Sequence, residues 1–219
     1  MNEATNDAAP SNRTVVRRYS WLARYDRETI NAILDAALVC QIAYVIDGQP
    51  YVTPTNFWRI DGHVYWHGSA ASRMLRGQAT RIPICFSVTH LDGLVIARAA
   101  FNHNVNFRSV MAFGVAELLD EQDKRTALKA FSDRVMLGLW EHARQPTEKE
   151  WRLTHVLRMP LDEVSAKVRT GPPVDDDEDY ALDSWSGVIP IHTVTGEVQP
   201  DPRLRPGIET PDFVRKFRL

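Results

Sequence analysis

The sequence has few of the patterns that mark a catalytic nucleophile or a nucleotide-hydrolysing site. Only two cysteines occur among the 219 residues, and they form no CxxC pair. Both Cys40 and Cys85 lie inside apolar runs, so we expect packed, reduced thiols without a catalytic role. The sequence contains no Walker loop, and it shows no arrangement of serine, histidine and aspartate typical of a catalytic triad. It therefore gives no support for nucleophilic or NTPase chemistry.

Excess charge and long apolar runs are scarce as well. The formal net charge is only −2 at pH 7, whereas nucleic-acid-binding proteins usually carry a basic face. Apolar runs such as residues 36–40 and 94–96 are too short to cross a bilayer. The polar N-terminus contains no apolar segment of a signal peptide. We therefore expect a cytoplasmic protein, without nucleic-acid or membrane partners, that binds small molecules or copies of itself.

Composition divides the chain into three parts. Residues 1–14 are polar and have little to bury, which predicts a disordered tail. Residues 15–195 carry the strand and helix patterns of one domain. Residues 196–219 begin in a proline-rich stretch and are predicted to form an extended arm.

Helical signals occur at four places. Asp26 is a candidate N-cap, and Ile30, Ile33 and Leu34 follow at helical spacing, which predicts a helix in DRETINAILDAA. Further helices are predicted at residues 69–78, at residues 120–139, and in the TEKEW segment after Pro146.

Three Asp-Gly pairs interrupt runs of β-branched and aromatic residues, a strong hairpin signal. The pairs at 47–48 and 61–62 predict a three-strand meander, and the pair at 92–93 predicts a hairpin between a strand at 81–89 and a fifth strand. Later strands are predicted at 107–118, with a bulge or bend at Gly114, and in THVLRMPLDEVSAKV and SWSGVIPIHTV. The acidic run at 175–179 is interpreted as a solvated loop. Six or more antiparallel strands with few helices predict a mainly β fold, a β-barrel with flanking helices.

The segment HVYWHGSAASRMLR is the candidate binding site, because a strand there leads into small, hydroxyl-bearing residues and the start of a helix. Free amides at a helix start, a serine hydroxyl and an arginine would together bind a phosphate. Gly68, Ser69, Ser72 and Arg73 supply these groups, and their small size lets a ligand approach the backbone. An ordinary surface helix, capped by Ser69 and with Arg73 in solvent, would explain the same residues.

His67 ends the predicted strand. His63 and His67 would lie about 13 Å apart along a strand, too far to share a metal ion, so we predict no metal site. We interpret His67 as a contact to the ligand whose phosphate binds at this segment. The alternative is a histidine that forms a hydrogen bond to the backbone.

The order of these elements resembles that of the FMN-binding split-barrel proteins typified by pyridoxamine 5′-phosphate oxidase. In that family a Tyr-Thr pair at the end of a strand leads to a Ser-Arg-Lys motif that holds the FMN phosphate. Here Trp66-His67 and Ser72-Arg73 stand at these positions, with Met74 in place of the lysine. The resemblance implies that Arg59, Ser72 and Arg73 neutralise the phosphate and that Asn56 and His67 line the flavin.

Two further segments resemble the same family. FRSVMAFGVAEL is similar to its Arg-Gln-Val strand, so Arg108 falls on the arginine and Ser109 on the glutamine that faces the flavin. VLRMPLDEVSAKV is similar to its penultimate strand, and Lys167 falls where the family has a tryptophan contributed by the partner subunit. The resemblance thus implies a homodimer with the flavin site at the subunit interface.

The resemblance extends over residues 17–191 and is nearest to the nitroimidazole-reductase-like branch, as in HGSAASR and SAKVRTGPP. It implies an FMN-dependent oxidoreductase. A pyridoxamine phosphate oxidase in the strict sense is disfavoured by Met74 and Lys167. A flavin- or haem-binding module without turnover and a deazaflavin-dependent reductase remain alternatives.

Overall fold

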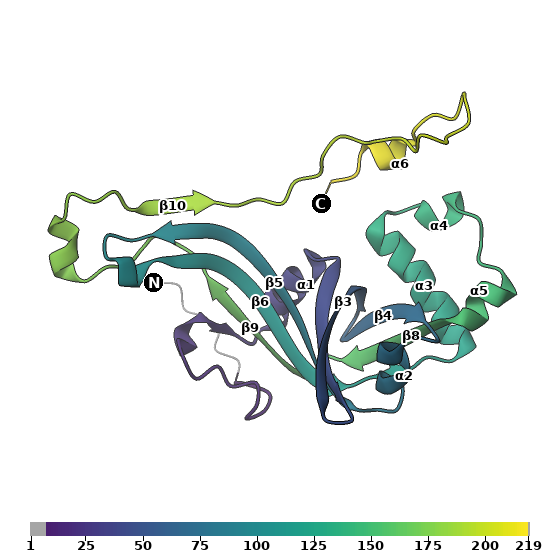
Figure 1. Ribbon diagram of the computed structural model, residues 1–219, viewed down its shortest axis with the longest axis horizontal. Coiled ribbons are helices and arrows are strands. Elements are labelled where there is room, and N and C mark those ends of the chain that lie inside the picture. Colours follow the sequence, from purple (N-terminus) through teal and green to yellow (C-terminus); the bar gives the residue numbers. More distant parts are fainter. Residues whose placement is uncertain (1–7, 219) are drawn as a thin grey trace.

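The chain forms one curled antiparallel sheet with helices at its edges and ends (Figure 1). The computed structural model describes residues 8–218. The strand order is β1-β9-β6-β5-β2-β3-β4-β8-β7, and β10 adds to β5. This architecture confirms the predicted mainly β split barrel with flanking helices.

The element bounds follow from the backbone. The strands are β1 (Ala23–Arg24), β2 (Val39–Ile46), β3 (Gln49–Ile60), β4 (His63–Ser69), β5 (Pro83–Ile96), β6 (Asn104–Val115), β7 (Glu117–Leu118), β8 (Thr154–Pro160), β9 (Glu163–Arg169) and β10 (Gly187–Pro190). The α-helices are α1 (Arg27–Asp35), α2 (Arg73–Gln78), α3 (Glu121–Val135), α4 (Leu139–His142), α5 (Glu148–Leu153) and α6 (Asp212–Arg215). Short 3₁₀ turns are η1 (Ser20–Leu22), η2 (Ala100–Asn102) and η3 (Asp177–Ala181).

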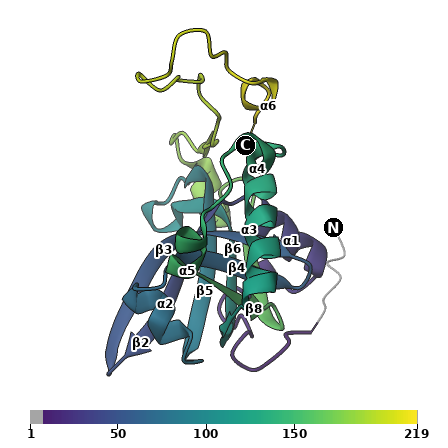
Figure 2. The ribbon, with the colours of Figure 1, turned by 90° about the vertical axis from the view of Figure 1, so that its right-hand side faces the viewer.

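The four predicted helices are present, and side-chain caps start α1, α3 and α5, whereas α2 begins at Arg73, later than predicted, without a side-chain cap. The Asp26 carboxylate accepts a hydrogen bond from the Thr29 amide at 2.8 Å and so starts α1. Asp120 caps α3 in the same way, and α5 begins with a reciprocal capping box between Thr147 and Glu150. Helix α3 packs against β3 and β8 (Figure 2).

The first two Asp-Gly hairpins are also confirmed. Asp47 and Gly48 both have positive φ angles, 50° and 76°, in the turn between β2 and β3. Asp61, with φ at 49°, turns the chain from β3 into β4. Turns of this kind match the right-handed twist of the strands that they join.

The third Asp-Gly prediction is wrong. Asp92 and Gly93 lie inside the single strand β5, which pairs with β6 along almost its whole length, and the register shifts between Leu91 and Gly93. The side chain of Asp92 is held by Arg108 across the ladder at 2.8 Å. A Cβ atom on Gly93 would lie 3.0 Å from the carbonyl oxygen of Ile189, so glycine here permits the close approach of β10.

Gly114 serves packing and does not create a bulge. It pairs with Ile84 in regular register. A Cβ atom at Gly114 would lie 2.8 Å from Cγ and Sδ of Met159, so its small size makes room for this core side chain.

The buried apolar side chains of the sheet form two clusters. The larger one fills the curl of the sheet and includes Phe57, Trp66 and Phe86, each at most 1% exposed. The smaller one, with Trp58 and Val156, lies on the other face of β3, β4 and β8 and packs against Phe131 of α3. Alternation along β3 and β4 therefore sends neighbouring residues to different clusters.

The acidic run is only partly the solvated loop that the sequence predicts. Asp175 is buried, and its carboxylate accepts hydrogen bonds from the amides of Arg98 and Ala99 at 3.0 and 3.2 Å and from the Asn102 side chain. These bonds, led by that from the Arg98 amide, hold the pKa of Asp175 below its ordinary value. Asp175 thus closes the turn between β5 and β6.

The predicted tail and arm are only partly described. Residues 1–7 of the predicted tail lie outside the described residues, while Thr14 is buried, with its hydroxyl bonded to the Ser11 carbonyl. Residues 191–211 contain no helix or strand. The short α6 that follows places Phe213 against His142 of α4, with ring centroids 5.3 Å apart.

Among the described residues, none of the helices is long and apolar enough to span a membrane.

A buried hydrogen bond ties α2 to the barrel, which yields a stability prediction. Gln78 is fully buried and accepts from the indole N–H of Trp66 at 2.9 Å. Gln78→Ala leaves this donor unpaired, so we expect the free energy of unfolding to fall by about 1–3 kcal/mol. Chemical denaturation measures this change. Gln122→Ala at an exposed position of α3 is the matched control, and an equal loss in both variants would contradict the role of the bond.

Candidate functional site

The small residues between β4 and α2 are shaped partly by protein packing. A Cβ atom on Gly68 would lie 3.2 Å from Cδ2 of Leu75, so the glycine lets α2 lie close against β4. Ser69 accepts from the Ala71 amide at 3.2 Å and is not the helix cap. Ser72 is the N-cap residue, but its hydroxyl makes no capping hydrogen bond. Of these groups, the Ser72 hydroxyl is the one that remains available to a ligand.

Arg73 lies at an open, basic hollow beside α2. Its guanidinium donates to the Tyr51 hydroxyl at 2.9 Å and stacks on that ring at 4.8 Å from the centroid. The hollow has a volume of about 700 Å³ and contains a second cation, Arg76, and one acidic residue, Asp47. Two guanidinium groups and one carboxylate favour an anionic ligand there.

The structure does not bring Arg59 to this hollow. Its guanidinium is bound to the Asp35 carboxylate at 2.6 and 3.0 Å and to the Asp61 carbonyl at 2.9 Å. Asn56 is exposed and, by alternation, lies on the same face of β3 as Trp58. The side chains of Asn56 and Arg59 therefore leave β3 on opposite faces.

His67 lies between β4 and α3 in an aromatic environment. Its ring centroid is 5.8 Å from that of Trp58 and 5.0 Å from that of Phe131. Nδ1 is buried without a hydrogen-bond partner, so the predicted alternative of a backbone hydrogen bond through this atom is not formed. Burial lowers the pKa of His67, which keeps the imidazole neutral at pH 7. Neutral imidazole is the form of histidine that binds metal ions and haem iron.

Arg108, Ser109 and Lys167 form a second group on β6 and β9. Arg108 binds the Asp92 carboxylate through two hydrogen bonds of 2.8 Å, which hold the pKa of Asp92 below its ordinary value. Ser109 pairs with Lys167 across the ladder, and its hydroxyl donates to the Lys167 carbonyl at 3.4 Å. The Lys167 ammonium lies 5.5 Å from the centroid of the Tyr19 ring.

The predicted site residues thus fall into two groups within one chain. The strands β5 and β2 separate β6 from β3 in the sheet. One group lies on β3, β4 and α2, and the other on β6 and β9. Sequence reasoning missed Tyr51 and Phe131 as neighbours of Arg73 and His67, because both contacts come from elements that are distant in the sequence. It also missed Asp35 as the partner of Arg59 for the same reason.

Comparisons with known proteins support a defined family and two close structural relatives. The model of the family described as "Pyridoxamine 5'-phosphate oxidase" matches residues 26–168. The structure of the flavocytochrome Anf3 from Azotobacter vinelandii is 50% identical, covers 97% of this chain and 100% of its own, and has a TM-score of 0.93. The FAD and heme binding protein from Mycobacterium smegmatis is 35% identical, with coverages of 89% and 96% and a TM-score of 0.85.

A more distant structure shares the fold alone. A putative 5-nitroimidazole antibiotic resistance protein from Bacteroides thetaiotaomicron is 22% identical, with coverages of 67% and 86% and a TM-score of 0.54. None of the curated proteins matches this chain.

The low pKa of His67 predicts a specific loss of stability in acid. In the unfolded chain this histidine takes up a proton near its ordinary pKa of 6.5, whereas in the folded protein it stays neutral to lower pH. Acidification therefore favours the unfolded state. Between pH 8 and pH 5.5 we expect the free energy of unfolding to fall more in the native protein than in His67→Phe. Parallel pH profiles for the two proteins in denaturant titrations would contradict this assignment.

Proposed function

The chain belongs to the pyridoxamine 5′-phosphate oxidase family, and from this premise we propose that it is a flavin- and haem-binding oxidoreductase. The observation that carries the proposal is the 50% identity, over nearly the full length of both chains, to a protein described as a flavocytochrome. The 35% identical relative described as an FAD and heme binding protein supports the same pair of cofactors.

We assign the haem iron to His67. His67 would hold the iron, because burial lowers its pKa and keeps it neutral, its Nδ1 has no hydrogen-bond partner among the described residues, and Trp58 and Phe131 pack beside it. The rings of Trp58 and Phe131 pack beside the imidazole and restrict its orientation. His155 also has an unpaired, buried Nδ1, but alternation places it on the other face of β8 from Val156, away from this cluster.

We assign the flavin phosphates to the hollow beside α2. Arg73 and Arg76 supply two cations there, and the Ser72 hydroxyl is not engaged in capping. The 35% identical relative is described as an FAD and heme binding protein. We therefore propose FAD in place of the FMN that the sequence predicts. Arg59 has no part in this assignment, because Asp35 already binds it.

In this proposal the cofactors carry out electron transfer, and the residues of the chain bind and position them. The flavin and haem supply the electron-transfer chemistry when bound. The chain contributes charge at the hollow, a neutral imidazole beside α3, and apolar walls around it. We still predict contacts to the flavin ring from Asn56, Ser109 and Lys167. Two strands separate β6, which carries Ser109, from β3 in the sheet order, and three separate β9, which carries Lys167. We propose that these two residues contact the flavin from the second copy of a homodimer.

The purified protein provides the direct test of cofactor identity. We expect it to carry both a flavin absorption band and a Soret band, and mass spectrometry of the molecules released on denaturation should identify FAD. Reduction of the flavin by NAD(P)H, followed by reoxidation with an acceptor, would support turnover. FMN or a deazaflavin in the released fraction would contradict the FAD assignment. A colourless protein that takes up neither cofactor would contradict the whole proposal.

Two alanine variants test the two assigned sites separately, and each serves as the control of the other. Arg73→Ala should weaken flavin binding by about 1.5–3 kcal/mol, the scale of a hydrogen bond to a charged group, and leave the Soret band intact. His67→Ala should abolish the Soret band and retain the flavin. Titration of the apoprotein with each cofactor measures both effects.

Matched substitutions separate these effects from general damage. Arg152→Ala changes an exposed arginine of α5, and His63→Ala removes the other histidine of β4 on the same face as His67. Both controls should bind both cofactors normally. If Arg73→Ala retains full flavin affinity, Arg73 is an ordinary surface residue of α2. If His63→Ala or His155→Ala loses haem and His67→Ala does not, the iron ligand is misassigned.

A further inference from the structure

Two buried polar atoms lie unpaired in neighbouring rings beside α3. The indole N–H of Trp58 and Nδ1 of His67 are both buried without a hydrogen bond to any described residue. The two rings contact each other, with centroids 5.8 Å apart, and both pack against Phe131. Because an unpaired buried polar group is costly, two of them in contact indicate a site whose ligand pairs both. His67 is assigned to haem iron above, whereas the donor of Trp58 has no assignment.

The unpaired donor of Trp58 differs from that of the other fully buried tryptophan of the sheet. Trp66, in the larger cluster, donates its indole N–H to the side-chain oxygen of Gln78 at 2.9 Å. Buried tryptophans usually have such an acceptor. Trp58 is 1% exposed, so solvent does not take this role. Tyr65 stacks on a face of the Trp58 ring, with planes 18° apart, and leaves the in-plane N–H uncovered.

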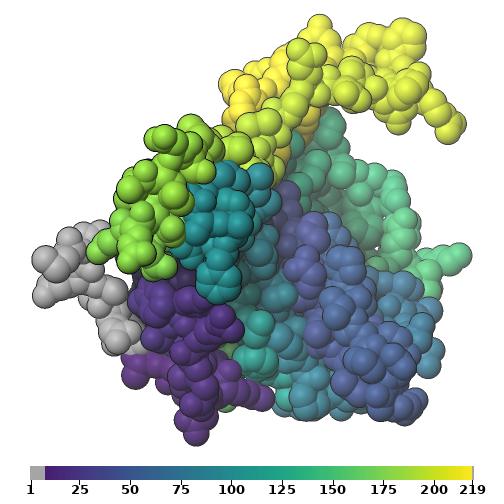
Figure 3. All heavy atoms as spheres, turned by 60° about the vertical axis from the view of Figure 1, so that its left-hand side comes forward, coloured from purple at the N-terminus to yellow at the C-terminus, as the bar shows by residue number. Residues whose placement is uncertain are grey.

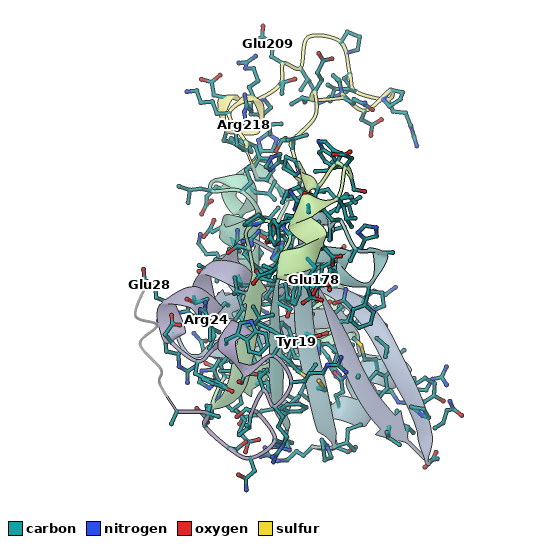
Figure 4. All side chains as sticks on the ribbon, turned by 90° about the vertical axis from the view of Figure 1, so that its left-hand side faces the viewer. Tyr19, Arg24, Glu28, Glu178, Glu209 and Arg218 are labelled. Carbon is teal, nitrogen blue, oxygen red and sulfur yellow. The ribbon has the colours of Figure 1, made fainter. Side chains whose placement is uncertain are left out.

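The C-terminal arm does not supply the missing acceptor in the part that the structure describes. Figure 3 shows the arm, in yellow, along the top of the molecule, beyond the blue strands β3 and β4. Glu209 and Arg218 lie in this outlying part of the chain, away from the sheet (Figure 4). The donor of Trp58 is therefore open to a ligand from outside the chain.

The chemistry of haem restricts which group could accept from Trp58. An indole nitrogen donates and does not accept. The pyrrole nitrogens of haem bind the iron, and its methyl and vinyl groups are apolar, so the acceptors of the porphyrin are its propionate carboxylates. A small ligand of the iron would lie on the side of the haem opposite His67, whereas Trp58 lies beside His67 on the same face of the sheet.

We propose that Trp58 is a positioning residue whose indole N–H donates to a haem propionate when His67 binds the iron. This inference rests on the haem assignment of the proposed function. A contact at the rim and a bond at the iron together fix the rotation of the porphyrin about the iron–histidine axis. The hydrogen bond has a charged acceptor, and such bonds are roughly twice as strong as neutral ones.

Paired titrations with two porphyrins test this contact. Native apoprotein and Trp58→Phe are titrated with haem and with haem dimethyl ester, in which both propionates are uncharged, and the Soret band measures each affinity. We expect Trp58→Phe to weaken haem binding about tenfold or more, the scale of a hydrogen bond to a charged group. For the ester we expect a loss of only about twofold to threefold, since its carbonyl is a weaker acceptor. Trp151→Phe makes the same change in α5, outside the smaller cluster, and should leave both affinities unchanged.

A measurement on the native chain covers the case in which Trp58→Phe does not fold. Zinc protoporphyrin carries the same propionates and a diamagnetic metal, so NMR can follow the indole proton of Trp58, assigned through its backbone. We expect this proton to move further downfield with zinc protoporphyrin than with its dimethyl ester. The ester serves as the control for the ring current, because both porphyrins place the same ring beside Trp58.

The outcomes separate the propionate contact from the haem assignment. Equal losses of affinity for haem and its ester in Trp58→Phe would overturn the contact and leave the iron on His67. An indole shift that is the same for both zinc porphyrins would do likewise. A native protein that binds neither haem nor its ester would overturn the haem assignment and the contact together.

Discussion

The pairing of β5 with β6 is the constraint on which the rest of the structure depends. The first half of β5 pairs with β2 on its other edge, and its second half pairs with β10. One strand therefore belongs both to the barrel and to the extension that carries η2. The register shift between Leu91 and Gly93 lies where these two neighbours change. Bulges increase local twist, so the shift lies where β5 exchanges one neighbouring strand for another within the same sheet.

Local signals in the sequence were sufficient for most elements of the barrel. The cap at Asp26, the capping box at Thr147 and the turns at Asp47 and Asp61 each depend on interactions within a few residues. The family resemblance, carried by the order of HGSAASR, FRSVMAFGVAEL and SAKVRTGPP, is confirmed by the family model. The curled sheet predicted from it is confirmed as well.

The errors arise where distant residues decide the outcome. Asp92-Gly93 has the composition of a hairpin turn, but Arg108 binds the aspartate and β10, almost a hundred residues later, requires the glycine. Arg59 fits a phosphate ligand in sequence, yet Asp35 at the end of α1 binds it. Asp175 belongs to an acidic run, but it is buried, and its carboxylate accepts a hydrogen bond from the amide of Arg98 in a distant turn. In each case the sequence predicts contact with solvent or a ligand, whereas the structure shows a contact with a residue that is distant in the sequence.

The residues of the candidate site are of two kinds, those engaged by contacts within the fold and those left open to a ligand. Gly68 is small because Leu75 packs on it, whereas Arg73 and Arg76 keep their charge at an open hollow and His67 keeps an unpaired nitrogen. Residues that are already satisfied within the fold hold the site in shape, and residues left unsatisfied are the ones available to a ligand. The proposed assignments therefore rest on the polar groups that the fold leaves open to a ligand as well as on the sequence motif.

The bonds of Asp175 have a consequence for how this chain folds. The turn after β5 cannot satisfy its own backbone, because the amides of Arg98 and Ala99 depend on a carboxylate more than seventy residues later. That carboxylate lies beyond residue 168, where the match to the family model ends. Two backbone donors within the segment common to the family therefore have their acceptor outside it. Opening of the chain around residue 175 would expose these two amides, so local opening of the β5–β6 turn and of the segment that follows β9 should be coupled.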